Sequence, residues 1–271
     1  MTTSTASGIN VSMPTQNLPT TPRHRKILML VQTRGYMSNE DLAQQLDVAV
    51  QTIRRDVNLL ANQGYLARHH GGAGLPSSIE NIAYDERQVL NQRAKDAIGR
   101  VAAELVPNRS TIFINIGTTT ESFARALNEH RDLRVVTNNL HVASILSRRT
   151  DFRTVVAGGS IRPADGGIVG ASAIESLESF RAEFGVIGIS GIEEDGTLLD
   201  FDLDEIQCAR AIIRHSRRVI LLADHTKFGR HPMGRVGDLS DIDDFVTDQA
   251  PSPEFQARMA AANVTLHVAR P

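Results

Sequence analysis

The chain has 271 residues, of which 41% are apolar and 22% are charged, a composition typical of a globular protein long enough for two domains. No apolar run has the length of a membrane-spanning helix, and residues 1–19 lack the basic start of a secretory signal. The single Cys208 excludes an internal disulfide and a cysteine-based zinc finger. We therefore expect a cytoplasmic protein without a metal or other cofactor, in which Cys208 is a small buried helical side chain.

Positive charge is concentrated near the N-terminus. Residues 20–74 contain seven lysines and arginines against four acids, a net charge of +3, which leaves −5 for the rest because the total is −2. A basic module beside an acidic body is typical of DNA-binding proteins, since phosphate neutralisation supplies much of their affinity. The excess is modest, so charge by itself does not decide the function.

The N-terminal region divides into a tail and a small helical domain. Residues 1–20 are rich in Ser, Thr, Asn and Pro without periodicity, which predicts a disordered tail. Within a domain at 21–74, the apolar spacing predicts a first helix over 23–33. Ser38, a residue type that often caps helices, predicts the start of a second helix.

A third predicted helix, which begins near Val50, has two distinct faces. Ile53, Val57 and Leu60 follow helical spacing and are expected to face a core. The opposite face gathers arginine and amide side chains, which suit phosphates and base edges. A strand over 65–68 then enters a basic glycine turn, which completes the plan of a winged helix-turn-helix, although a small helical domain with solvated arginines is the alternative. The candidates for DNA contact are Gln51, Thr52, Arg54, Arg55, Asn58, Arg68, His69 and His70.

The remainder of the chain predicts an α/β domain. Residues 75–90 are expected to be a linker, although helical periodicity starts at 84 and continues to 106. From residue 111, β-branched runs such as TIFI, LRVVT, FGVIGIS and RRVILLA alternate with helical segments, which predicts a largely parallel sheet over 91–250. Residues 251–271 are expected to form a C-terminal segment. Open sheets of this kind bind ligands beyond the carboxyl ends of their strands.

One of the loops that follow these strands has the composition of a phosphate site. Residues 115–121 read Asn-Ile-Gly-Thr-Thr-Thr-Glu between a predicted strand and a predicted helix, and Thr118 with Glu121 forms a capping-box pattern. Gly117 permits a ligand to approach the backbone closely, and a helix start presents unpaired N–H groups to an anion. A plain strand-to-helix turn explains these residues equally well.

Polar side chains after the other strands favour the ligand site. Lys227 follows the strand RRVILLA and is expected to supply a cation for phosphate. The acids within 200–205 offer acceptors to hydroxyl groups, although acids near a helix start also complement the helix dipole. The candidates for effector binding are Asn115, Gly117, Thr118, Thr119, Thr120, Asn138, Asn139, Arg162, Asp200, Asp202, Glu205 and Lys227.

Several segments, taken in order, resemble one protein family. QTIRRDVNLL and RHHGGA are followed by FINIGTTTES, TNNL, VAGG, GGIVG, FGVIGISGIEEDGTLLDFD and DHTKFGR, and this series resembles the DeoR family of bacterial repressors over about residues 22–248. The resemblance implies a winged helix-turn-helix followed by an α/β effector domain similar to the sugar-phosphate isomerase fold. It also implies a homodimer or homotetramer that binds double-stranded operator DNA and releases it when a phosphorylated metabolite binds.

Two details refine this resemblance. RHHGGAGLPSS and FGVIGISGIEEDGTLLDFD are most similar to the branch of the family that controls glycerol 3-phosphate metabolism, which makes sn-glycerol 3-phosphate the expected effector. Asn115 stands where many members of the family carry Asp, and this puts in doubt any contact that needs a carboxylate there.

The isomerase-like fold also raises an enzyme as an alternative. An isomerase needs positioned carboxylates for proton transfer, and Ser190 and Gly191 occupy part of the space where such acids would stand. We therefore expect a repressor without enzymatic activity. The alternatives are a sugar-phosphate isomerase with a DNA-binding module, an architectural DNA binder without an effector, and a repressor of another sugar-phosphate pathway.

Overall fold

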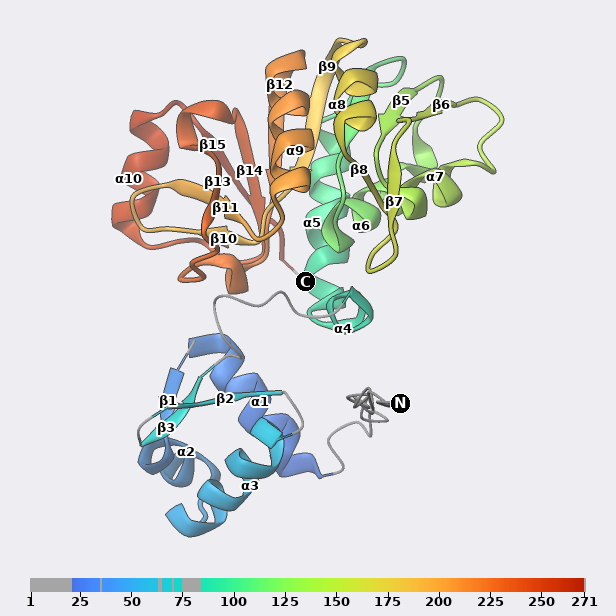
Figure 1. The fold of residues 1–271 in the computed structure, drawn as a ribbon. Helices are drawn as coiled ribbons and strands as arrows, with labels where there is room; N and C mark the ends of the chain where they lie inside the picture. Colours follow the sequence, from blue (N-terminus) through green and yellow to red (C-terminus); the bar gives the residue numbers. More distant parts are fainter. Residues whose placement is uncertain (1–20, 35, 63–64, 70, 75–83, 271) are drawn as a thin grey trace, which may run out of the picture. The chain divides into compact units, whose positions relative to one another are not determined.

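Figure 1 shows the computed structural model, in which the described residues are 21–34, 36–62, 65–69, 71–74 and 84–270. The chain divides into two units, one within residues 1–77 and the other within residues 78–271. The expected tail at 1–20 and most of the expected linker lie outside the described residues. No helix in the described part is long and apolar enough to cross a membrane.

The first unit combines three helices with a small sheet. Its elements are α1 (Pro22–Arg34), β1 (Tyr36–Ser38), α2 (Asn39–Leu46), α3 (Val50–Asn62), β2 (Ala67–His69) and β3 (Gly72–Gly74). The strands pair antiparallel in the order β1-β3-β2, and β2 with β3 forms the wing. The winged helix-turn-helix is confirmed, with two differences: periodicity does not reveal the three-residue β1, and β2 begins at Ala67 rather than Tyr65.

The helices of this unit start and pack as their sequences predict. The Ser38 hydroxyl accepts a hydrogen bond from the backbone N–H of Asp41 at 3.0 Å and so caps α2. Ile53, Val57 and Leu60 of α3 are at most 3% exposed and belong to one core with residues of α1 and α2. Burial of each such side chain stabilises the unit by about 1.5–3 kcal/mol.

A partly buried ion pair also joins α1 to α3. Asp56 of α3 accepts a hydrogen bond from Arg23 Nε at 2.5 Å and lies 3.2 Å from His24 Nε2. Burial acts to raise the pKa of Asp56, but the hydrogen bonds from Arg23 and His24 outweigh it and hold the pKa below its usual value. The carboxylate therefore stays ionised and fixes α3 against α1.

The second unit is a three-layer α/β/α structure. Its N-terminal half contains α4 (Tyr84–Val89), α5 (Gln92–Glu104), β4 (Thr111–Ile114), α6 (Thr118–Ala126), β5 (Arg134–Thr137), α7 (Leu140–Leu146), β6 (Arg153–Val156), β7 (Ser160–Arg162), β8 (Gly167–Val169) and α8 (Ala171–Glu178). Its C-terminal half contains β9 (Ala182–Gly188), β10 (Gly191–Ile192), β11 (Thr197–Asp200), α9 (Leu203–His215), β12 (Ser216–Leu222), β13 (Gly234–Asp238), β14 (Asp244–Thr247), α10 (Pro253–Ala261) and β15 (Thr265–Val268).

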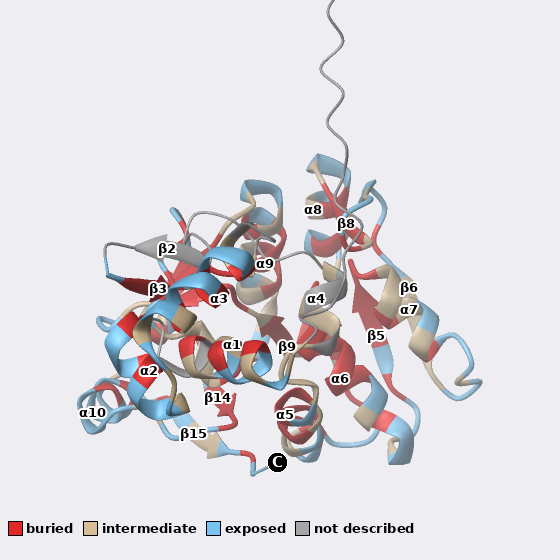
Figure 2. Cartoon of the chain, turned by 90° about the horizontal axis from the view of Figure 1, so that it is seen from below, coloured by how far each residue is buried: buried red, intermediate tan, exposed pale blue. Residues whose placement is uncertain are grey.

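Seven parallel strands form the central sheet in the order β15-β14-β12-β9-β4-β5-β6. Alternate residues of each strand enter two separate cores. Ile112 and Ile114 pack with α5, α6 and α7, whereas Phe113 packs on the other face with α8, α9 and α10. Figure 2 shows buried residues gathered on the strands and on the inward faces of the helices. Burial on both faces explains why these strands are continuous apolar runs.

Cys208 belongs to α9 and faces the core. It is fully buried, and burial raises the pKa of its thiol to about 11. The thiol therefore stays protonated at neutral pH, and Cys208 is a small core side chain, as its sequence context predicts.

The predicted helix at 84–106 is broken into two. Helix α4 ends at Val89 and α5 begins at Gln92, because Asn91 has a left-handed conformation with a φ of 54°. Ordered structure in this unit thus begins before the expected boundary at residue 91. At the other end, α10 and β15 extend the unit past residue 250, and β15 pairs with β14 rather than forming a separate segment. Two small antiparallel sheets, β10-β11-β13 and β7-β8, are also absent from the predicted strand alternation.

Candidate effector site and DNA-binding face

The strand order places a topological switch point between β4 and β9, and we call the region beyond the carboxyl ends of these two strands the crevice. From β4 the chain continues outward through β5 and β6, while β9 begins the opposite series toward β12, β14 and β15. Helix α6 packs in one core and α9 in the other, so the segments that follow the two strands diverge to opposite faces. Ligands bind at such switch points in open α/β sheets, beyond the carboxyl ends of the strands.

Helix α6 begins at this crevice without a side-chain cap. Its N-cap is Gly117, whose φ of 145° suits glycine, and the first-turn N–H groups of residues 118–120 have no intrahelical carbonyl to bind. The predicted capping box is wrong, because within the described residues no side chain caps α6 and Glu121 instead accepts a hydrogen bond from the Tyr84 hydroxyl at 2.9 Å. The helix therefore presents bare N–H groups and its positive dipole end.

The three threonines of this turn differ in what their hydroxyls contact. Thr120 is fully buried and lies 2.8 Å from the carbonyl oxygen of Asn115 and 2.7 Å from that of Gly117, to which its hydroxyl donates. The hydroxyls of Thr118 and Thr119 make no hydrogen bond to any described residue. Thr120 thus holds the loop together, while the other two hydroxyls are available to a ligand.

Two cations that follow β12 lack a counter-ion in the described part of the chain. Lys227 ends a short turn, and Arg230 lies three residues further along. Neither side chain forms an ion pair there, although Arg230 is only 8% exposed, with its guanidinium over the ring of Phe201 at 5.1 Å. Burial lowers the pKa of Lys227 to about 8 against the opposing effect of Asp224, and it also lowers the pKa of Arg230. Because unpaired buried charge is costly, this arrangement favours an anion.

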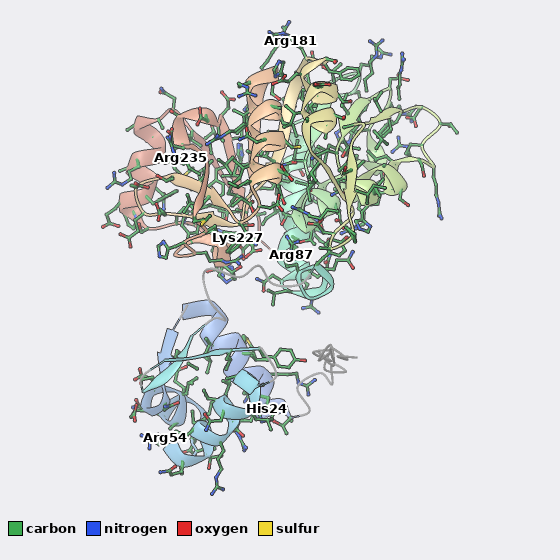
Figure 3. The ribbon with its side chains drawn as sticks, in the orientation of Figure 1. His24, Arg54, Arg87, Arg181, Lys227 and Arg235 are labelled. Atoms are coloured by element: carbon green, nitrogen blue, oxygen red, sulfur yellow. The ribbon has the colours of Figure 1, made fainter. Side chains whose placement is uncertain are left out.

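Helices α4 and α5 bring two further cations to the same region. Lys95 is 3% exposed and donates from Nζ to the carbonyl oxygen of Arg87, and its pKa is lowered to about 8 by burial, with the charge of Lys227 adding to the decrease. Arg87 Nη2 lies 3.4 Å from Asp165, and Arg87 Nε is buried without a hydrogen-bond partner among the described residues. Figure 3 shows Arg87 and Lys227 at the same end of the unit and Arg181 at the opposite end. We call Arg87, Lys95, Lys227 and Arg230 the cation cluster.

Sequence reasoning identifies only one member of the cation cluster, Lys227. The position of Lys95 in the sequence does indicate a special role, because Lys95 lies on the apolar face of α5, where an unpaired lysine is unusual. Arg230 closes the segment DHTKFGR, which contains Lys227. The sequence around Arg87 does not indicate that it joins the cluster, because its position depends on the break between α4 and α5.

The predicted residue Arg162 is neutralised by carboxylates. Its guanidinium lies 2.8 Å from Asp165, 2.8 Å from Asp202 and 2.5 Å from Glu205. Asp202 also caps α9 by accepting from the backbone N–H of Glu205 at 2.9 Å. Arg162 and Asp202 thus have internal partners, and a direct contact of either with an effector stays a prediction. The network approaches the cation cluster through Asp165, which contacts Arg87.

Glu205 of this network interacts with a second acid, the buried Asp200. Burial raises the pKa of Asp200, and burial together with the charge of Asp200 raises the pKa of Glu205 to about 8. Both carboxyl groups cannot easily be ionised together, so a proton is retained near neutral pH. A protonated carboxyl both donates and accepts hydrogen bonds, which suits recognition of a hydroxyl group.

The predicted asparagines are enclosed at the carboxyl ends of β4 and β5. Asn138 Nδ2 donates to the carbonyl oxygen of Ile168 at 3.2 Å, and Asn139 Oδ1 accepts from first-turn N–H groups of α7. Asn115, Asn138 and Asn139 each retain one buried side-chain atom without a partner among the described residues. The observed hydrogen bonds of Asn138 and Asn139 stabilise the fold, and direct effector contacts by these asparagines stay predictions.

Helix α3 presents its predicted polar face to solvent. Arg54 lies 3.7 Å from Glu40 of α2, a pair of exposed side chains that contributes little to stability. On the wing, Arg68 and His69 lie in β2, and His70 lies outside the described residues. Thr52 is half-buried, and the exposed residues of the face are Gln51, Arg54, Arg55 and Asn58.

The positions relevant to an isomerase also have local partners. Ser190 is 6% exposed at the end of β9 and acts as a hydrogen-bond donor to Asp200. Glu193 lies 3.2 Å from His231 Nδ1, and both side chains are at least 36% exposed. Glu193 is therefore one half of a surface pair.

A winged helix-turn-helix followed by an α/β unit with a cation cluster beyond the carboxyl ends of its strands defines a DNA-binding regulator with a sensor domain. The chain belongs to the DeoR family: residues 23–79 match the DeoR-like helix-turn-helix domain and residues 90–249 match the DeoR C terminal sensor domain.

Close relatives support the same assignment. The chain is 49% identical to the glycerol-3-phosphate regulon repressor of Escherichia coli (strain K12) over 231 residues, which cover 85% of this chain and 92% of that protein. It is 48% identical to the repressor of the same name from Haemophilus influenzae over 229 residues, which cover 84% and 89%. These relatives are transcriptional repressors, which confirms the expectation of a regulator rather than an enzyme.

A solved structure of ribose 5-phosphate isomerase A from Neisseria gonorrhoeae is similar at a TM-score of 0.37 and 17% identity, over 49% of this chain and 52% of that one. Similarity at this level carries no argument about function. The expected fold class, a winged helix-turn-helix followed by an α/β effector domain, is confirmed by the two family matches and the strand order.

Proposed function

We propose that this repressor binds a palindromic operator as a dimer or tetramer and releases it when a small phosphorylated metabolite, sn-glycerol 3-phosphate, occupies the crevice beside α6. One observation carries the effector proposal: Lys227 and Arg230 form no ion pair with any described residue, and the charge of Lys227 acts on Lys95, which also interacts with Glu121 of the uncapped first turn of α6. The similarity to glycerol-3-phosphate regulon repressors supports the choice of glycerol 3-phosphate.

The parts of the site have separate tasks in this proposal. The phosphate receives hydrogen bonds from the N–H groups of residues 118–120 and from the hydroxyls of Thr118 and Thr119, and its charge is matched by Lys227 and Arg230. Asp200 and Glu205 provide acceptors and a donor for the glycerol hydroxyls. Lys227 and Arg230 also interact electrostatically with Asp200, so the phosphate and hydroxyl sites are adjacent.

Release of the operator requires that the effector bind the DNA-incompetent arrangement more tightly than the competent one. A shift in operator affinity of ~10–100-fold corresponds to a coupling free energy of ~1.4–2.7 kcal/mol. A phosphate that gains several charge-assisted hydrogen bonds in one arrangement supplies a difference of this size.

A thermal-shift screen on the full chain tests the effector class. A phosphorylated metabolite at about 100 times its Kd should stabilise the sensor unit by about 2.7 kcal/mol, which raises its Tm by several degrees. We expect sn-glycerol 3-phosphate to do so, while glycerol at the same concentration leaves the Tm unchanged. If deoxyribose, fructose or tagatose phosphates shift the Tm more, the effector is a different sugar phosphate. If no phosphorylated compound shifts it, the effector proposal is wrong.

Effector binding should weaken above about pH 8. The pKa values of Lys95 and Lys227 are about 8, and a bound dianion stabilises the charged lysines and raises both values. Binding then takes up protons at alkaline pH, so affinity falls as the pH rises through about 8. Affinity should also fall below about pH 6, where the phosphate monoester gains a proton. Calorimetry with sn-glycerol 3-phosphate from pH 5 to 10 measures this, and Lys227→Arg should retain more of its affinity at pH 9. An unchanged affinity from pH 7 to 10 would exclude the lysines.

A further inference from the structure

Helix α4 is the first described element after residues 75–83, which connect the two units along the chain. It packs against α6, the helix that starts at the crevice (Figures 1 and 2). Side chains near both of its ends contact different parts of the site. Along the chain, α4 is therefore the described element of the sensor unit that is closest to the DNA-binding unit.

Tyr84 joins the start of α4 to the phosphate helix. Its hydroxyl donates to Glu121 Oε1 at 2.9 Å and its ring stacks on His141, with centroids 4.8 Å apart and planes 14° from parallel. Burial, and then the Glu121 carboxylate, raises the pKa of Tyr84, so the hydroxyl remains a donor. Glu121 is 1% exposed and lies in the first turn of α6. The hydrogen bond therefore connects Tyr84 directly to the turn that would hold the phosphate.

Arg87 joins the other end of α4 to the cation cluster. Its side chain is 15% exposed and lies 3.4 Å from Asp165, its acidic contact among the described residues. Asp165 also contacts Arg162 at 2.8 Å. Its Nε is buried with no partner among the described residues, so the guanidinium has unmet hydrogen-bonding capacity. The charge of Arg87 acts on Lys95, Lys227 and Arg230, and Lys95 Nζ donates to the carbonyl oxygen of Arg87, so Arg87 belongs to the same electrostatic cluster.

We propose that Arg87 is a direct ligand of the effector phosphate and that occupation of the site therefore fixes α4 on the sensor unit, which transmits effector binding to the segment leading to the DNA-binding unit. This inference rests on the proposed function and adds to it a binding residue and a route of transmission. A planar guanidinium with a free Nε donates to two phosphate oxygens at once, which an ammonium group cannot do.

The charges around Arg87 give this arrangement its direction. Arg87 has the same charge as the other three members of the cation cluster, and its contact with Asp165 is long at 3.4 Å, so the charges of the cluster oppose its docking. With an anion, the repulsion becomes attraction. Linkage then requires reciprocity: the factor by which the docked helix raises anion affinity equals the factor by which the anion favours docking.

The test compares four full-length proteins, each with and without saturating sn-glycerol 3-phosphate: wild type, Arg87→Ala, Arg87→Lys and the control Arg93→Ala. Arg93 is an exposed arginine of α5 near Arg87 in the sequence. Calorimetry measures affinity, hydrogen–deuterium exchange follows peptides that contain residues 84–89, and operator titrations give the ratio of DNA affinities without and with effector. Inorganic phosphate serves as a second probe that lacks the glycerol group.

In wild type and Arg93→Ala, both probes should slow exchange in residues 84–89, and the effector should weaken operator binding. Arg87→Ala should lose about 10–100-fold in affinity for both probes, as expected for a lost charge-assisted hydrogen bond. Even when saturated, it should show little added protection of α4 and a ratio of operator affinities close to 1. Arg87→Lys, which keeps the charge and guards against a folding defect, should show a smaller loss of both effects.

Different failures have different meanings. If Arg87→Ala and Arg87→Lys bind the probes as wild type does while Lys227→Ala does not, the phosphate site stands and this inference is wrong. It is also wrong if saturated Arg87→Ala releases the operator fully, or if wild-type α4 gains no protection when the probe is bound. If neither probe binds the wild type, the proposed effector site and this inference fail together.

Discussion

Replacing Arg54 or Arg55 with alanine is expected to weaken operator binding strongly, because both guanidinium groups are exposed on the polar face of α3 with Gln51 and Asn58. An arginine that reads a base edge should contribute about 1–3 kcal/mol of sequence discrimination, whereas one that contacts phosphate should weaken binding to all DNA alike and reduce its salt dependence. Titration of each variant against salt, on DNA selected from a random pool by the wild type and on unselected DNA, separates the two roles.

Arg25 provides a charge-matched control for this experiment. It is exposed on α1 of the same unit, so Arg25→Ala removes one positive charge from a different helix. We expect it to leave the ratio of selected to unselected affinity unchanged. If both Arg54→Ala and Arg55→Ala bind selected DNA like the wild type, α3 is not the recognition helix and another face of the unit must contact DNA.

The N-terminal unit was more accessible to sequence reasoning than the sensor site, for a physical reason. The face of α3 is set by helical geometry alone, so the spacing of Ile53, Val57 and Leu60 determines which side chains are exposed. The main strands are likewise marked by apolar runs, because a parallel sheet buries both faces. Short antiparallel pairs such as β10-β11 lack this mark, since two-residue strands carry no periodicity.

The cation cluster could not be predicted because it depends on contacts distant in sequence. Asn91 alone interrupts an otherwise continuous helical pattern, and this break allows Arg87 to approach residues more than 75 positions away, such as Asp165. Arg162 shows that a sequence pattern does not reveal partners from distant parts of the chain. A cation after a glycine-rich turn suggests an anion site, but its partners at Asp202 and Glu205 come from another part of the chain.

Lys227→Ala should yield a repressor that binds operator DNA but no longer releases it at effector concentrations that fully release the wild type. The substitution removes a cation that has no ion-pair partner within the described residues, so the fold loses little while the anion loses a charge-assisted hydrogen bond. That loss should cost about 1.5–3 kcal/mol of effector binding. Arg230→Ala should have a similar effect, although loss of its packing on Phe201 also lowers stability.

Calorimetry with sn-glycerol 3-phosphate and operator titrations at increasing effector concentration measure this effect, with Arg181→Ala as the control. Arg181 is exposed at the opposite end of the sensor unit (Figure 3), so its loss changes net charge equally without touching the crevice. A defect caused by weaker binding alone is corrected by excess effector, and Lys227→Ala should therefore release the operator at concentrations about 10–100-fold higher. If its affinity equals that of Arg181→Ala, the phosphate binds elsewhere, because a cation in contact with a dianion cannot be removed without cost.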